Sequence, residues 1–165
     1  MNDKREYIID FIRENQNDMY RFAYSYVKNR EDALDIIQES VVKAISSSKS
    51  LKDISRIKPW IFKIIVNEAY KLFKSSRIYT DDTGIDVMEY ESYTDNLTEY
   101  IDKQAVLKEV MDLDEKYRII IVLRYFEDMQ IKEIGSILNI SQSMVKSRLY
   151  KALYVLKKRL GEDYL

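Results

Sequence analysis

Apolar residues recur at spacings of three and four along most of the chain, and this pattern predicts a succession of amphipathic helices. Residues 4–28 fit one long helix, in which the polar run 14–18 is a candidate bend or break. Asn29 is a candidate N-cap for the next helix, because its side chain can accept a bond from a first-turn N–H group. The residues predicted to line the buried side of that helix are Ala33, Leu34, Ile36, Ile37, Val41, Val42 and Ile45.

A third helix is expected to begin after Ser55, a candidate cap, and to reach about Ser76, with Pro59 in the first turn, where proline is tolerated. Its predicted core stripe consists of Ile57, Trp60, Ile61, Ile64, Ile65, Ala69, Leu72 and Phe73. Its opposite side carries basic and amide groups at helical spacing, namely Arg56, Lys63, Asn67, Lys71 and Lys74. Trp60 is a candidate for the core, which is the commoner place for a lone tryptophan, or for stacking on a base.

No apolar period holds in residues 79–98, which we interpret as an acidic linker. Twenty extended residues span up to about 66–72 Å, and two turns of B-DNA cover about 68 Å. The linker is therefore long enough to hold two modules on one duplex about two turns apart.

The chain after the linker is again helical in pattern. A helix is expected over Tyr100–Leu113, and Asp114 is a candidate cap for an apolar helix over Glu115–Phe126. The five consecutive apolar residues 119–123 place that helix at the centre of the second module.

The last segment, Met129–Leu160, has the pattern of a helix-turn-helix. Gly135 is small where a second helix can pass close, Asn139 tolerates the left-handed backbone of a tight turn, and Ser141 is a good N-cap. The second helix is predicted to bury Val145, Leu149, Ala152, Leu153, Leu156 and Leu160. Its other face carries Ser143, Lys146, Ser147, Tyr150 and Lys151, which can enter a DNA major groove. The alternative is an amphipathic helical hairpin with a solvated basic face.

Composition narrows the classes of function. Three Gly and one Pro in 165 residues favour an all-α fold. The chain has no His and no Cys, which excludes zinc fingers, disulfides and Ser-His-Asp triads. We find no glycine-rich phosphate loop, no signal sequence and no run of about 18 apolar residues, so we expect a cytoplasmic protein that is not an enzyme.

The net charge of −1 hides a strong segregation of charge. Six basic and nine acidic residues fall in 1–40, and eight basic and two acidic residues in 49–77. Residues 79–102 hold eight acidic and no basic residues, whereas 142–160 hold six basic and no acidic ones. Two positive blocks separated by a negative one indicate two surfaces for polyanions. Ordinary solvated helix faces are the alternative.

These patterns leave three classes of protein open: a protein with two nucleic-acid-binding modules, a stand-alone helix-turn-helix regulator, and a protein-interaction bundle. The basic face of the third helix, with amide and aromatic groups interleaved, suits a single nucleic-acid strand. A stand-alone helix-turn-helix regulator would not need that module, and a pure protein-interaction bundle would make both basic blocks a coincidence. The polar face with Asp35, Gln38, Glu39 and Lys43 is either solvated or a surface for a partner.

Four ordered stretches resemble the bacterial sigma factors of the extracytoplasmic-function (ECF) group, which contain regions 2 and 4 only. Residues 20–39 are similar to regions 2.1 and 2.2, and residues 58–67 to region 2.3 running into 2.4. Residues 114–128 are similar to region 4.1, and residues 145–152 to region 4.2. Residues 25–40 and 124–128 are most similar to the SigV-type factors of Firmicutes.

The resemblance implies two small helical domains, region 2 in residues 1–78 and region 4 in residues 99–165, joined by the acidic linker 79–98. It implies that Asp35, Gln38 and Glu39 bind the β′ clamp helices of core RNA polymerase. The loop 46–56 would capture a flipped base of the −10 element. The implied −10 contacts are Arg56, Lys58, Trp60, Lys63, Asn67 and Lys71, and the implied −35 contacts are Ser143, Lys146, Ser147, Arg148, Tyr150 and Lys151.

The resemblance also implies the partners. They are core RNA polymerase, through the β′ clamp helices and the β flap, promoter DNA, and a membrane-anchored anti-sigma factor. It implies a monomer with no cofactor, no metal and no small-molecule substrate.

Overall fold

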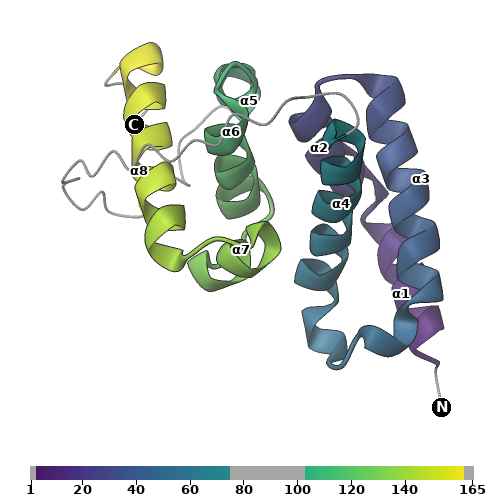
Figure 1. Cartoon of the computed structure of the whole chain (residues 1–165). Coiled ribbons are helices and arrows are strands. Elements are labelled where there is room, and N and C mark those ends of the chain that lie inside the picture. The colour runs from purple at the N-terminus through teal and green to yellow at the C-terminus, as the bar shows by residue number, and fades with distance from the viewer. Residues whose placement is uncertain (1–2, 75–102, 162–165) are drawn as a thin grey trace. The chain divides into compact units, whose positions relative to one another are not determined.

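We describe residues 3–74 and 103–161 in a computed structural model of the protein (Figure 1). All regular structure in these residues is helical, which confirms the all-α prediction. They fall into two units, drawn from purple to teal and from green to yellow in Figure 1, and each is described by itself. The predicted linker 79–98 lies outside the described residues.

Four helices and two short 3-10 turns form the first unit. In chain order they are α1 (Lys4–Glu14), α2 (Gln16–Val27), α3 (Arg30–Ser46), η1 (Ser48–Ser50), η2 (Ile54–Arg56) and α4 (Ile57–Lys74). The helices α2, α3 and α4 pack against one another, and α1 packs against α3. The predicted break between α1 and α2 falls at Asn15, whose side-chain amide donates to the Phe11 carbonyl at 2.9 Å. The predicted cap of α3 is confirmed, because Asn29 accepts from the Asp32 N–H at 3.1 Å.

Aromatic packing between α2 and α4 forms the centre of this unit. The rings of Phe22 and Phe62, both fully buried, lie 4.9 Å apart, and Tyr26 meets Phe22 edge-on at 5.5 Å. The predicted core stripe of α4 omitted Phe62 and Val66, which are buried, and included Trp60, which is only half-buried. The helix is therefore rotated from the predicted orientation.

The buried side of α3 also differs from the prediction. Leu34 and Val42, predicted to be buried, are 42% and 65% exposed. Ser40 and Ala44 lie in the core instead, and the Ser40 hydroxyl donates to the Ile36 carbonyl at 2.6 Å. A hydroxyl that bonds within its own helix can be buried without an unpaired donor, and small residues let α3 approach its neighbours closely.

The loop between α3 and α4 is fixed at both ends. Leu51 is buried, and its carbonyl accepts from the Lys4 ammonium at 2.8 Å. The predicted cap was wrong: Asp53, not Ser55, is the N-cap, and it caps η2 rather than α4. The Asp53 carboxylate accepts from the Ser55 N–H at 3.0 Å and from the Ser55 hydroxyl at 2.8 Å.

The second unit contains the remaining elements. They are α5 (Lys103–Met111), α6 (Glu115–Ile121), the π-helical turn η4 (Val122–Phe126), α7 (Ile131–Leu138) and α8 (Gln142–Leu160). Helices α5 and α6 each pack against α8. The apolar residues 119–123 are all buried, which confirms the central position of their helix. Asp114 occupies the N-cap position of α6 as predicted, but its side chain makes no capping bond.

The turn between α7 and α8 has the predicted chemistry. Asn139 adopts left-handed backbone angles, φ 55° and ψ 46°, and Ser141 accepts from the Met144 N–H at 3.1 Å. The Ile140 N–H donates to the Gly135 carbonyl at 3.0 Å. A Cβ atom on Gly135 would stand 2.9 Å from the Ile140 carbonyl oxygen and 3.8 Å from the Val145 side chain on α8, so both the turn backbone and the second helix pass close to it.

We expect Asn139→Ala to destabilise the second unit by about 1 kcal/mol, because a residue with a Cβ and no local polar group is strained in the left-handed region. Asn139→Gly, the matched variant, should be at least as stable as the parent, since glycine adopts this conformation without strain. Urea unfolding followed by circular dichroism measures both. Equal unfolding midpoints for the alanine and glycine variants would contradict the left-handed conformation at position 139.

We expect Ser55→Ala to raise the pKa of Asp53 toward its ordinary value of 3.8. The two bonds from Ser55 stabilise the ionised carboxylate and lower its pKa. Their contribution to stability is therefore present above about pH 4 and is lost as the pH falls through the lowered pKa. Titration of the carboxyl carbon by NMR gives the shift. Ser50→Ala is the control, because that hydroxyl donates to the Ser47 carbonyl and not to Asp53.

Candidate nucleic-acid interface

One candidate surface lies on α3. Asp35, Gln38 and Glu39 are all exposed, and their spacing places them on one face of the helix. The exposed side chains of Leu34 and Val42 flank them. The surface therefore combines polar groups with solvent-accessible apolar groups, as protein–protein interfaces do. This apolar component was not predicted, because the helical spacing of Leu34 and Val42 is also that of core residues.

A second surface follows α4 and the turn before it. Lys63, Asn67 and Lys71 recur every four residues and are exposed, so they form one stripe along the helix. Arg56 is exposed on η2. Lys58 and Trp60 are half-buried, and the Lys58 ammonium lies 5.9 Å from the centre of the Phe62 ring.

An acidic residue lies within this basic stripe. The Glu68 side chain is only 10% exposed, and its Oε1 atom accepts from the Lys71 ammonium at 3.0 Å. The Lys43 ammonium, which comes from α3, lies 3.9 Å from the same oxygen. The hydrogen bond that Lys71 donates to Glu68 raises the pKa of Lys71 above its ordinary value. Glu68 is the one acidic residue in α4, but nothing in the sequence pairs it with Lys43 on α3.

A groove of about 300 Å³ opens beside this cluster. Its lining combines two ammonium groups, a carboxylate, an amide, an aromatic ring and an aliphatic side chain, from Lys43, Ile64, Asn67, Glu68, Tyr70 and Lys71. Of the residues predicted for the strand surface, the groove brings together Asn67 and Lys71 and does not include Arg56, Lys58, Trp60 or Lys63.

The third surface is the outer face of α8. Ser143 and Lys146, in its first two turns, are exposed, and the four other predicted residues, Ser147, Arg148, Tyr150 and Lys151, are half-buried. The Lys151 ammonium lies 5.6 Å from the centre of the Tyr117 ring on α6, within reach of a cation–π interaction. Ser143 and Lys146 are therefore the most accessible of the predicted groove-reading residues.

No helix within residues 3–74 and 103–161 has the length and apolar character needed to cross a membrane.

Comparison with known proteins agrees with this arrangement. The family model "Sigma-70 region 2" matches residues 11–78, and the model "Sigma-70, region 4" matches residues 103–156. The RNA polymerase sigma factor SigV of Bacillus subtilis (strain 168) is 37% identical over 161 residues, which cover 96% of this chain and 93% of SigV. The ECF RNA polymerase sigma factor SigM of the same organism is 31% identical over 149 residues, 86% of this chain and 87% of SigM.

A solved structure shows the same fold. It is the co-crystal structure of the sigma factor RpoE in complex with the anti-sigma factor NepR from Bartonella quintana, which matches with a TM-score of 0.68. The match covers 93% of this chain and 98% of that chain at 24% identity. The two region models and the extended identity to SigV and SigM show that this chain belongs to the ECF group of RNA polymerase sigma factors.

Proposed function

We propose that this protein binds core RNA polymerase, directs it to promoters that carry −35 and −10 elements, and assists their melting. The observation that supports this most is the presence of both sigma regions, in order, with a helix-turn-helix in the second. The protein is then a cytoplasmic transcription initiation factor without catalysis of its own. We assign region 2 to residues 1–78, the linker to 79–98 and region 4 to 99–165.

The α3 surface is the proposed contact with the β′ clamp helices. Asp35, Gln38 and Glu39 supply polar contacts that fix orientation, and Leu34 and Val42 supply apolar area that is removed from water on binding. A polar surface alone would contribute little binding free energy, because exposed ion pairs contribute about 0–1 kcal/mol each. The exposed apolar pair is therefore what gives this face the means to hold a large partner. Region 4 is the proposed contact with the β flap.

The α4 surface is the proposed site for the non-template strand of the −10 element. Lys63 and Lys71 neutralise phosphates, and Asn67 between them presents an amide to an exposed base edge. The fixed loop 46–56 captures one flipped base. Flipping costs a few kcal/mol of unstacking, so a preformed loop is an advantage, because it does not also have to be ordered on binding.

Helix α8 is the proposed reader of the −35 element. In a helix-turn-helix the N-terminal part of the second helix contacts base edges, which favours Ser143, Lys146 and Ser147. Lys146 can donate to guanine O6 and N7. The half-buried Arg148 and Tyr150, and Lys151, which is held over Tyr117, lie further along the helix and contact the groove wall or backbone.

An anti-sigma factor is the proposed regulator. The RpoE structure that this chain resembles contains the anti-sigma factor NepR. For this chain we propose a membrane-anchored anti-sigma factor that covers the polymerase-binding and DNA-binding surfaces, with the sigma factor as a monomer in its active form.

Reconstitution tests the proposal. Core RNA polymerase, with and without this protein, transcribes fragmented genomic DNA, and the 5′ ends of the transcripts are sequenced. We expect new start sites that share two upstream elements and that appear only with the protein. Failure of the protein to bind core polymerase at low salt, or start sites without a shared motif, would refute the proposal.

Two variants separate the proposed roles of the regions. We expect Lys146→Ala to weaken binding of the holoenzyme to duplex promoter DNA by about 1–3 kcal/mol, the scale of one base contact. Asn67→Ala should leave that binding intact and slow opening of the −10 region, measured by permanganate reactivity of unpaired thymines. Lys108→Ala, an exposed lysine on α5, is the control. Equal effects of both variants on duplex binding would contradict the proposed division, in which α8 binds the duplex −35 element and α4 binds the melted −10 strand.

A further inference from the structure

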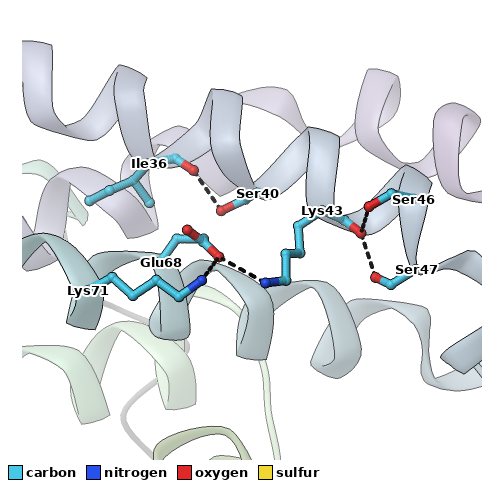
Figure 2. Close-up of polar contacts among 7 residues, drawn as sticks. All are labelled: Ile36, Ser40, Lys43, Ser46, Ser47, Glu68 and Lys71. Atoms are coloured by element: carbon cyan, nitrogen blue, oxygen red, sulfur yellow. Dashed lines mark hydrogen bonds and ion pairs between the residues drawn. The ribbon is translucent and has the colours of Figure 1, made fainter.

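Glu68, Lys43 and Lys71 form a cluster that joins α3 to α4 (Figure 2). Both ammonium groups approach the same carboxylate oxygen, at 3.0 Å for Lys71 and 3.9 Å for Lys43. The carboxylate is recessed at 10% exposure, whereas the two lysine side chains are 59% and 55% exposed. The cluster therefore presents two cations to solvent above a sheltered anion. These three groups carry a net charge of +1, and the exposed Glu39 carboxylate on α3 also acts on the Lys71 ammonium.

The chain fixes the points from which the two lysines extend. Lys43 lies in the last turn of α3, and its carbonyl accepts bonds from the hydroxyls of Ser46 and Ser47 (Figure 2). Lys71 extends from α4, which packs against α3. Two cations on separate helices would repel each other and diverge, and the shared oxygen of Glu68 holds them together.

Such a pair is suited to one phosphate group. The two nitrogens are separated by no more than the sum of their distances to the shared oxygen. An ammonium group has three N–H donors, so a bond to Glu68 leaves donors for a second anion. The groove beside the pair adds the Asn67 amide, the half-exposed Tyr70 ring and Ile64, which suit the base and sugar of the same nucleotide.

We infer that Lys43 and Lys71 bind one backbone phosphate of the single DNA strand in this groove, and that Glu68 is the positioning residue that holds them there. The inference rests on the proposed function of α4. It adds Lys43 to the strand surface, although this residue lies on the helix that carries the polymerase-binding face. It also gives a role to the one acidic residue in α4.

The variant Glu68→Gln distinguishes two roles for this carboxylate, which either positions the two lysines or only reduces the positive charge of the surface. If Glu68 only reduced the positive charge of the surface, its neutralisation would strengthen binding of a polyanion. If Glu68 positions the two lysines, the same change weakens binding by about tenfold, the scale of a hydrogen bond to a charged group. The two roles therefore predict opposite signs.

The test uses holoenzyme and fork DNA made from a promoter found by reconstitution, with the −10 non-template strand left single. Dissociation constants are measured across a salt series. For single strands the slope of log K against log salt falls by about 0.7 for each phosphate that the protein no longer neutralises. We expect the slope for the double variant Lys43→Ala/Lys71→Ala to fall by about 0.7 in total, because both lysines serve one phosphate. A fall of about 1.4 would mean two separate phosphates and would overturn the shared site.

Replacing single phosphates by a neutral linkage identifies the phosphate that the two lysines bind. Single methylphosphonate substitutions are placed in turn along the unpaired strand. We expect one position at which the affinity of the wild-type holoenzyme falls, while the affinities of Lys43→Ala/Lys71→Ala and Glu68→Gln fall no further than they already have. Additive decreases at every position would overturn the inference.

Controls separate this outcome from misfolding and from failure of the proposed function. Glu14→Gln removes an exposed carboxylate at the end of α1, and Lys108→Ala removes an exposed ammonium on α5; both should match the wild type. Circular dichroism checks the fold of Glu68→Gln, and the exposed Lys43→Ala carries the test if that variant unfolds. Wild-type transcription with unaffected Lys43 and Glu68 variants would overturn the inference alone, whereas a wild-type holoenzyme that does not bind promoters would overturn both proposals.

Discussion

The contact between Phe22 and Phe62 determines how α4 is oriented in the first unit. Two fully buried rings 4.9 Å apart leave little freedom to rotate either helix, because protein interiors are packed at crystal-like density. Once Phe62 faces α2, positions 63, 67 and 71 have to face outward. The same contact that stabilises the core therefore also presents the basic stripe to solvent, so this stripe cannot shift without disrupting apolar packing.

The exposed face of α3 changes in charge along the helix. After Arg30 at its start, the exposed face of α3 is acidic and apolar at Leu34 and Asp35, and it is basic again at Lys43, in the last turn. A cation at that end is favoured by the helix dipole. The surfaces proposed for polymerase and for the DNA strand thus meet at the carboxyl end of α3, where the Glu68 cluster joins the two helices (Figure 2).

The sequence predicted the helices better than it predicted their orientation. The break at Asn15, the caps at Asn29 and Ser141 and the turn at Asn139 depend on a few consecutive residues, so local chemistry was enough to find them. The buried side of α3 was predicted wrongly, because choosing between Leu34 and Ser40 requires knowledge of the neighbouring helices. In the candidate site, the outward positions of Lys63 and Lys146 likewise follow from spacing along one helix. The approach of Lys43 to Glu68 joins residues 25 positions apart on different helices, and a single sequence contains no signal for such a pair.

The bond between Glu68 and Lys71 also fixes the response of the surface to protons. It raises the pKa of an ammonium that is already above 10, just as Ser55 lowers the pKa of a carboxylate that is already below 4. With no histidine in the chain, these shifts move charge changes further from neutrality. Neither the Lys71 ammonium nor the Asp53 carboxylate therefore changes its charge near neutral pH. If the proposed function is correct, access to this surface would have to be controlled by a partner that covers it rather than by acidification.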